Sequence, residues 1–354
     1  MKKVTDIHPK VLTAFRRGTV IPAQVLALDE RRSFSPRHQR ALTRYYIDSG
    51  VGGIAVGVHS TQFAIRDPKH GLFETVMSQT SHFIDEWCQR TGRKILKVGG
   101  VCGATLQALR EATFESENGY DAALVSLAAL KDDGIAAMLS HCREISQVMP
   151  IIGFYLQPAA GGCVLPYEFW EGFFQIENIL AVKIAPFNRY RTIDVIRALA
   201  QSGRGDIALY TGNDDNLLID LLTDFRVGGR LLRICGGLLG HWSVWTRKAV
   251  ELLDELHRLA GSGHAIPAEL LTRSAQITDC NAAFFDAANG FAGCIPGLHE
   301  VLRRQGLLPG IWCLDPGEVL SPGQYEEISR VYRDYPFLND DAFVAANLEK
   351  WLAD

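Results

Sequence analysis

The feature that most constrains the fold is a regular alternation of short apolar runs with longer amphipathic segments between residues 19 and 259. Short apolar runs bounded by turn residues predict buried strands, and apolar residues repeating every three or four positions predict helices. The expected strands are 19–27, 52–58, 94–101, 122–127, 150–157, 179–185, 206–212 and 231–237, each followed by a helix. Eight such pairs are typical of an α/β fold, the TIM (β/α)8 barrel. A doubly wound sheet is the rival, but no G-x-G-x-x-G turn follows the first strand.

The pattern changes beyond residue 262, where only helical periodicity remains. Helices are expected at 267–288, 295–305, 322–332 and 340–352, and a loop rich in Gly and Pro at 306–323. We therefore expect a barrel over residues 1–262 and a C-terminal helical extension over 263–354, packed on the barrel.

The composition of the chain limits the kinds of partner that we expect it to bind. A formal net charge of −4 gives no reason to expect a nucleic acid or an anionic membrane. No run approaches the length of a membrane-spanning helix, and no apolar segment follows the basic start Met1-Lys2-Lys3. The eight cysteines are scattered without metal-binding spacing, which indicates reduced core residues and no metal site. A cytoplasmic location is the default expectation.

A lysine interrupts the apolar strand expected at 179–185. Lysine is almost never fully buried without a partner or a function, because desolvating an ammonium is costly. Burial lowers the pKa of a lysine, and the resulting free amine can attack a carbonyl carbon. Lys183 is therefore a candidate Schiff-base lysine. The alternatives are a lysine that reaches the solvent at the rim, or one that pairs with a carboxylate.

Tyr155 lies in the C-terminal half of the strand before that of Lys183. Active sites of TIM barrels lie at the C-terminal ends of the strands, so these two side chains are expected to lie close together. A phenol beside an amine could carry protons as an imine forms. A core aromatic with a satisfied hydroxyl is the alternative. Lys97, in the third expected strand, is a weaker candidate for the active lysine, because it lies earlier in its strand.

The turn after the second strand carries groups suited to a carboxylate. Gly57, Ser60 and Thr61 offer amides and hydroxyls in a compact turn, although Ser and Thr are equally common as helix caps. His59 is a candidate acid or base, or else an exposed loop histidine.

The seventh strand ends in Thr211 and Gly212, which we take as further candidates for substrate binding. Asp214 and Asp215 follow directly and are expected to cap the next helix. A metal role for this pair lacks an evident third ligand.

Five segments, in this order, resemble motifs of the dihydrodipicolinate synthase/N-acetylneuraminate lyase superfamily. They are 52–54 (G-x-x-G-I entry to strand two), 99–105 (glycine-rich turn), 154–158 (Y-N-x-P), 182–183 (G-I-K) and 210–215 (S-G-D-D). The resemblance covers roughly residues 18–336. It implies a barrel, an imine on Lys183 with no other cofactor, proton relay by Tyr155, a 2-oxo acid such as pyruvate, and a homo-oligomer (dimer or tetramer).

Other motifs of the superfamily are altered. Its G-T-T-G-E turn is replaced at 57–61, and its T-P-Y-Y segment at 126–130 has no tyrosine. Ala160 stands where the synthases have a substrate-binding arginine, and Ile184 where an acidic residue follows the lysine. An arginine holds a carboxylate through two parallel hydrogen bonds, so its loss disfavours genuine dihydrodipicolinate synthesis.

The sequence therefore predicts a Schiff-base-forming lyase, of aldolase or dehydratase type, acting on a 2-oxo acid or a sugar-derived keto acid. Lys183, Tyr155 and His59 are the expected catalytic residues. Gly57, Ser60, Thr61, Thr211 and Gly212 are expected to bind the substrate. Two alternatives stay open: a barrel isomerase without imine chemistry, and a non-catalytic barrel that binds a small acid.

Overall fold

The computed structural model describes residues 1–260, 263 and 265–353, and it contains one eight-stranded sheet. The strand order is β1-β10-β7-β6-β5-β4-β3-β2. A parallel bridge between Ala23 and Ala55 joins the two ends of that order. The sheet is thus a nearly closed barrel, and the expected TIM barrel with a helical extension is confirmed.

The eight expected strands are confirmed, most of them within a few residues of their predicted bounds. They are β1 (Val20–Pro22), β2 (Gly53–Val56), β3 (Leu96–Val101), β4 (Ala122–Val125), β5 (Ile151–Leu156), β6 (Ile179–Ala185), β7 (Ala208–Thr211) and β10 (Ile234–Leu239). Every residue of β3, β4, β6 and β7 is buried. Burial on both faces explains why these strands are continuous apolar runs without alternation.

The chain divides into two compact units, which we call the first unit (Met1–Thr19 with Leu96–Leu238) and the second unit (Val20–Ile95 with Leu239–Asp354). The expected boundary at residue 262 falls outside the described residues. Helices α10 to α13, expected as an extension packed on the barrel, belong to the second unit together with residues 20–95.

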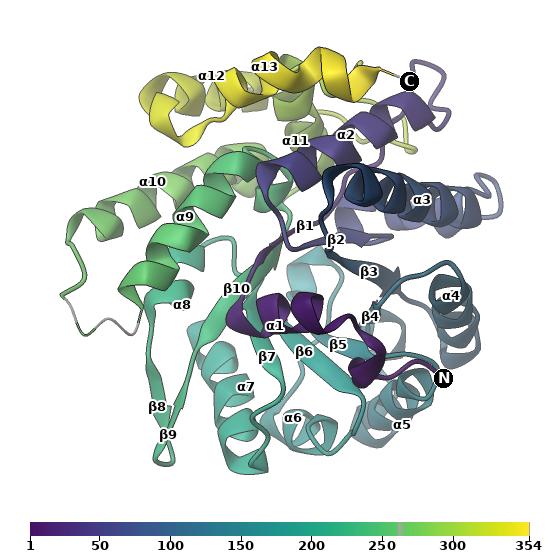
Figure 1. Cartoon of the computed structure of the whole chain (residues 1–354), viewed down its shortest axis with the longest axis vertical. Helices are drawn as coiled ribbons and strands as arrows, with labels where there is room; N and C mark the ends of the chain where they lie inside the picture. The colour runs from purple at the N-terminus through teal and green to yellow at the C-terminus, as the bar shows by residue number, and fades with distance from the viewer. Residues whose placement is uncertain (261–262, 264, 354) are drawn as a thin grey trace. The chain divides into compact units, whose positions relative to one another are not determined.

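In the first unit, helices alternate with strands β3 to β7 and lie outside them (Figure 1). The helices are α1 (Pro9–Arg17), α4 (Thr105–Glu117), α5 (Gly134–Ser146), α6 (Tyr167–Phe173), α7 (Arg189–Ser202) and α8 (Leu217–Leu222). Helix α1 was not predicted. It is tied to β7, because the Tyr210 hydroxyl donates a hydrogen bond to the Phe15 carbonyl at 2.7 Å and the two rings stack at 4.6 Å.

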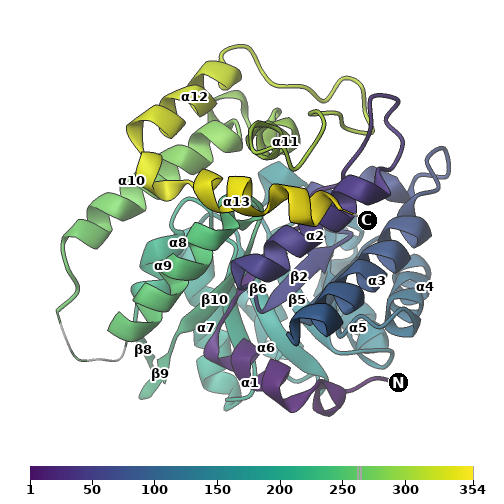
Figure 2. The same cartoon turned by 45° about the horizontal axis from the view of Figure 1, so that its top comes forward.

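In the second unit, α13 lies along α2 (Figure 2). The helices are α2 (Pro36–Ser49), α3 (Phe73–Thr91), α9 (Thr246–Leu259), α10 (Glu269–Phe284), α11 (Cys294–Arg304), α12 (Gln324–Asp334) and α13 (Asp341–Leu352). Tyr45 of α2 donates a hydrogen bond to buried Asp340 at 2.7 Å, and its ring packs edge-on against Trp351 at 5.5 Å. These contacts hold the last helix against one of the first.

One region differs from the expectation. Residues 213–225 were expected to be helical, but only α8 forms there, and an antiparallel hairpin of β8 (Phe225–Val227) and β9 (Arg230–Leu232) follows. The last barrel strand consequently begins at Ile234, three residues later than predicted. Gly228 and Gly229, both with positive φ, make the two-residue turn that such a hairpin requires.

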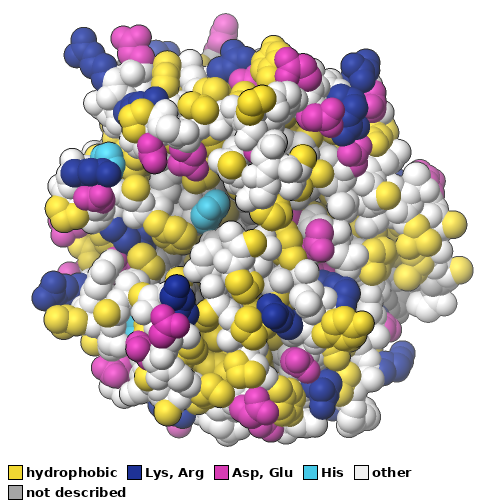
Figure 3. All heavy atoms as spheres, turned by 180° about the vertical axis from the view of Figure 1, so that it is seen from behind, with side chains coloured by type: hydrophobic (Ala, Val, Ile, Leu, Met, Phe, Trp, Pro, Cys, Tyr) yellow, Lys and Arg dark blue, Asp and Glu magenta, His cyan; other side chains and the backbone are white. Residues whose placement is uncertain are grey.

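The surface carries charges of both signs. Figure 3 shows dark blue Lys and Arg side chains interspersed with magenta Asp and Glu side chains over one face. This distribution agrees with the small net charge of −4. No helix in the described part of the chain is long and apolar enough to cross a membrane.

Candidate functional site

Lys183 is the fifth residue of β6 and is only 8% exposed. Burial lowers its pKa to about 8, against the opposing effect of the negative charge on Asp214. An amine with a pKa near 8 is about one-tenth unprotonated at pH 7. The strand therefore holds a lysine whose amine is partly unprotonated at neutral pH.

The side chain beside Lys183 on β5 is Phe154. The parallel register of β5 and β6 pairs Phe154 with Lys183, so both side chains lie on the same face of the sheet. The Lys183 Nζ atom lies 4.3 Å from the centroid of the Phe154 ring. This ring forms an apolar wall for the amine, and its π face attracts the protonated form.

Tyr155 does not lie beside Lys183, which corrects the sequence prediction. It pairs with Ile184, and successive strand residues point to opposite faces, so its ring lies on the other face of the sheet. There it packs on Trp170 of α6 at 5.5 Å, and its hydroxyl accepts a hydrogen bond from the Leu165 amide at 3.2 Å. Burial raises the pKa of this phenol. Tyr155 is thus a core residue that joins β5 to the segment before α6.

Gly212 borders Lys183 directly. A Cβ atom at this position would lie 2.7 Å from the Lys183 Cε atom and 2.8 Å from the Ala185 Cβ atom. The Gly212 amide donates to the Ile184 carbonyl at 2.7 Å, which continues the β6–β7 pairing into the turn. Only glycine leaves room for the lysine side chain here.

The negative charge of Asp214 acts on Lys183, a proximity that the sequence analysis did not predict. The Asp214 amide donates to the Gly212 carbonyl at 3.2 Å, and the residue is 6% exposed. Helix α8 begins at Leu217 with Asn216 as its N-cap residue, so Asp214 lies before the cap position that was expected for it. An acid three residues beyond the end of a barrel strand was the available signal.

Thr211 shapes this turn from the opposite face. It pairs with Ile184, and its hydroxyl donates to the Asp220 carboxylate at 2.7 Å. The same carboxylate pairs with Arg189 and accepts from the Asn213 side-chain amide at 3.0 Å. The Thr211 hydroxyl is thus used inside a buried network that fixes the turn.

In the second unit, the hydroxyls of Ser60 and Thr61 also donate hydrogen bonds, here to backbone carbonyls. Ser60 donates to the Ala23 carbonyl at 2.6 Å, and Thr61 donates to the Gln24 carbonyl at 2.7 Å. Thr61 also accepts a hydrogen bond from the Gly57 amide at 3.0 Å. The expected capture of a substrate carboxylate by these two hydroxyls is contradicted, since both protons are donated to backbone oxygens and the Gly57 amide is used by Thr61.

His59 is partly exposed at the start of the short 3-10 helix η2 (His59–Thr61), with its ring 6.0 Å from that of Phe63. A Cβ atom on Gly57 would lie 2.9 Å from the Met77 Sδ atom and 3.5 Å from the Arg66 Nη2 atom. An arginine thus adjoins this turn. It comes from the segment after the turn, and its sequence position gave no sign of this proximity.

Lys97 lies at the opposite end of its strand. It is the second residue of β3, and its amide donates to Asp121 at 3.0 Å. Since catalytic groups of TIM barrels lie at the C-terminal strand ends, its position does not favour the role of active lysine.

Among residues 1–260, 263 and 265–353, no group of three or more His, Cys, Asp or Glu side chains could hold a metal ion. The eight cysteines are all free thiols, four of them buried.

The fold matches known structures more clearly than the sequence does. No family model and no curated protein matches the sequence. A monomeric dihydrodipicolinate synthase variant is 20% identical, with a TM-score of 0.72 over 93% of this chain and 99% of that chain. The chloride-inhibited dihydrodipicolinate synthase from Acinetobacter baumannii, solved with pyruvate, is 17% identical, with a TM-score of 0.71 over 90% and 98%.

N-acetylneuraminate lyase from Fusobacterium nucleatum is 16% identical, with a TM-score of 0.70 over 91% of this chain and 99% of that chain. Both kinds of structure therefore match this chain along nearly all of their length. The resemblance indicated by the sequence motifs is confirmed at the level of the fold: this chain has the barrel of dihydrodipicolinate synthases and N-acetylneuraminate lyase.

Proposed function

We propose that this protein is a Schiff-base-forming lyase that acts on a 2-oxo acid such as pyruvate or a sugar-derived keto acid, with Lys183 as the nucleophile. The observation that carries the proposal is the position of Lys183, near the C-terminal end of a fully buried barrel strand, with a pKa lowered to about 8. The pyruvate in the Acinetobacter baumannii structure, which has the same fold, supports the substrate class.

The reaction begins when the lone pair of the Lys183 Nζ atom attacks the keto carbon. The amine loses its two protons, the carbonyl oxygen takes up two and leaves as water, and a C=N bond replaces the C=O bond. Once protonated, the imine accepts the electron pair of an adjacent C–C or C–H bond as that bond breaks. A dehydratase would then expel hydroxide from the next carbon, whereas an aldolase would release a carbonyl fragment.

Proton transfer needs a group other than Tyr155, whose hydroxyl lies on the opposite face of the sheet. We assign it to Asp214, because the Gly212 turn brings this buried carboxylate close enough to oppose the effect of burial on Lys183. A carboxylate beside the amine can take a proton as the carbinolamine forms and return it as water leaves. Phe154 keeps the opposite side of the amine apolar.

The other expected residues have narrower proposed roles. Gly212 leaves space for the lysine, and Thr211 positions the turn. Gly57, Ser60 and Thr61 set the shape of the 57–61 turn, in which the Ser60 and Thr61 hydroxyls donate to backbone carbonyls. His59, which is partly exposed, is kept as a candidate for a further proton transfer.

The chemistry proposed here uses the imine itself as the electron sink and needs no metal or organic cofactor. We further propose a cytoplasmic homo-oligomer, a dimer or tetramer, that binds neither nucleic acid nor membrane. These proposals follow from the composition and from the likeness to the superfamily.

Trapping with borohydride tests this function. The protein is incubated with pyruvate, other 2-oxo acids or no acid, reduced, and weighed intact by mass spectrometry. We expect an adduct with at least one 2-oxo acid, its loss in Lys183→Met and its retention in Lys97→Met, which removes the other buried barrel lysine. Persistence of the adduct in Lys183→Met would overturn the assignment.

A barrel that binds a small acid without imine chemistry is the second candidate. It is favoured by one observation: the phenol that pairs with Lys183, that of Tyr210 on β7, donates its proton to the Phe15 carbonyl at 2.7 Å, and the partner on β5 is Phe154. In that case 2-oxo acids would bind without forming a reducible adduct.

A further inference from the structure

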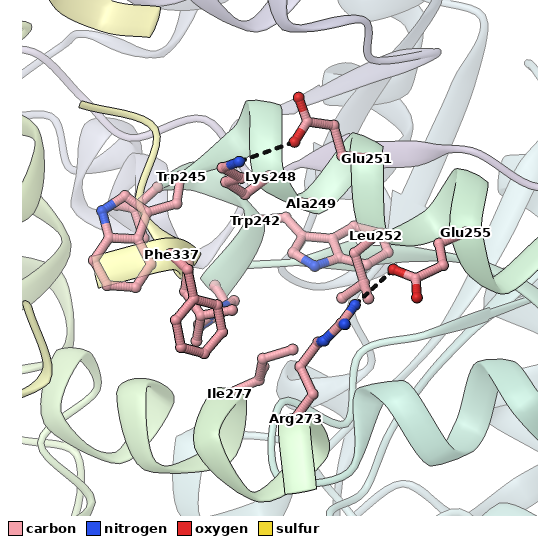
Figure 4. Close-up of a pocket in the computed structure, with 13 residues that line it drawn as sticks. Trp242, Trp245, Lys248, Ala249, Glu251, Leu252, Glu255, Arg273, Ile277 and Phe337 are labelled. Carbon is pink, nitrogen blue, oxygen red and sulfur yellow. Dashed lines mark hydrogen bonds and ion pairs between the residues drawn. The ribbon is translucent and has the colours of Figure 1, made fainter. Parts of the chain in front are cut away.

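A pocket of about 260 Å³ opens in the second unit, whereas the strand that carries Lys183 belongs to the first unit. Its walls come from the segment before α9, from α9 and α10, and from the segment after α12 (Figure 4). Trp242, Trp245, Leu252, Ile277 and Phe337 supply most of its apolar lining. This volume lies just below the range of roughly 300–1,000 Å³ for sites of drug-sized ligands, so only a small molecule fits.

On one side of the pocket, contacts with neighbouring rings fix the position of Trp245. Trp245 has φ of +51°, a left-handed conformation that costs a non-glycine residue free energy and occurs often at functional sites. Its ring is held edge-on by Phe284 at 4.9 Å and by Tyr332 at 5.1 Å. Phe337, by contrast, is 53% exposed at the pocket. Phe337 therefore offers an exposed aromatic face to a ligand in the pocket.

The rim carries two ion pairs: in one the cation precedes the anion along the chain, and in the other it follows the anion. Lys248 pairs with Glu251 at 3.1 Å along α9, and Arg273 of α10 reaches Glu255 of α9 at 2.6 Å (Figure 4). These side chains are 25–44% exposed, so water screens both ion pairs in part. Ligand charges can therefore replace either partner at little cost.

The signs of the four rim charges determine which charged ligands fit the pocket. The rim holds equal numbers of cations and anions, so a ligand with one charge would satisfy one side chain and displace its partner. A ligand with adjacent positive and negative groups satisfies both members of a pair. The guanidinium of Arg273 offers two parallel N–H donors to a carboxylate, and Glu255 offers oxygens to an ammonium.

We propose that this pocket binds a free α-amino acid with an aromatic side chain, which inserts its carboxylate and ammonium between Arg273 and Glu255 and places its ring against Trp242 and Phe337. This site is independent of the imine chemistry proposed for Lys183. The inference rests on the pocket, its aromatic lining and its balanced rim.

The test is calorimetric titration of the full chain with L-phenylalanine, 3-phenylpropionate, 2-phenylethylamine and glycine, with tryptophan fluorescence as a second readout. The two single-charge analogues each lack one end of the zwitterion, and glycine lacks the ring. We expect saturable binding of phenylalanine, about tenfold or more tighter than that of either analogue, since one charge-assisted hydrogen bond supplies at least that factor.

Three variants complete the test. Arg273→Gln and Phe337→Ala should each weaken phenylalanine binding about tenfold or more. Arg330→Gln is the matched control, because Arg330 and Asp279 form a similar ion pair between α12 and α10, at 2.8 Å and similar exposure. Circular dichroism and melting temperature confirm folding of each variant. Equal binding of all aromatic probes, no binding of phenylalanine, or unchanged affinity in Arg273→Gln would overturn the proposal.

Discussion

The protonation of Lys183 gives the sharpest quantitative prediction. Burial lowers its pKa from 10.5 to about 8. This shift corresponds to about 3 kcal/mol against the charged form. At pH 7 the unprotonated fraction is about 9% for a pKa near 8 and about 0.03% for an ordinary lysine, a difference of about 300-fold. The free amine of Lys183 should therefore become available near pH 8.

Competitive acetylation between pH 6 and pH 10, followed by peptide mass spectrometry, measures this availability. Lys69, whose side chain is 68% exposed, is an internal reference for the reagent. We expect the acetylation rate of Lys183 to rise with a midpoint near pH 8. A midpoint at or above pH 10 would refute the argument that burial prepares the nucleophile.

Asp214→Asn distinguishes the electrostatic effect of this carboxylate on Lys183 from its proposed role in proton transfer. Its charge raises the pKa of Lys183, so its removal should move the acetylation midpoint below pH 8. The same change should slow imine formation with a 2-oxo acid, because the proton-transfer group is lost. Asp215→Asn is the matched control and should change neither measurement. Faster acetylation together with unchanged imine formation would refute the catalytic role and leave the electrostatic one.

Three further predictions concern the supporting residues. Tyr155→Phe should leave imine trapping within about twofold of the unsubstituted protein and lower the free energy of unfolding by about 1–3 kcal/mol in urea, because the buried Leu165 amide loses its acceptor. Gly212→Ala should slow trapping at least about tenfold and cost about 1–3 kcal/mol of stability, since the new methyl group overlaps the active lysine and its neighbour. Burial lowers the pKa of His241 and of His299 to about 4, so the unfolded chain takes up these protons below pH 6.5 and the folded chain does not. Stability should thus be complete above pH 6.5 and decrease toward pH 4, by about 2 kcal/mol per histidine between pH 7 and pH 5 in urea titrations. Trapping lost in Tyr155→Phe, trapping unaffected in Gly212→Ala, or stability flat with pH would contradict the respective argument.

The fold was largely predictable because strand burial leaves a direct mark on the sequence. A parallel strand covered on both faces must be apolar throughout, so Lys183 stood out as the exception within β6. The hairpin of β8 and β9 was missed because its strands are short and partly exposed. The four C-terminal helices followed their amphipathic periodicity closely.

The candidate site was harder to predict, because function depends on which face a side chain occupies. Phe154 and Tyr155 are adjacent aromatic residues, and a shift of one position in the phase of β5 exchanges them. Only the pairing with β6 decides between them. The hydroxyls of Ser60 and Thr61 were misjudged for a related reason, since their acceptors lie 36 to 37 residues away in the chain.

The most direct measurement of the central claim is the location of the reduced adduct. After reaction with pyruvate and borohydride, the protein is digested and the modified peptide is sequenced by tandem mass spectrometry. The account predicts modification at Lys183 in β6. Modification at Lys97 or at an exposed lysine, with Lys183 unmodified, would contradict it.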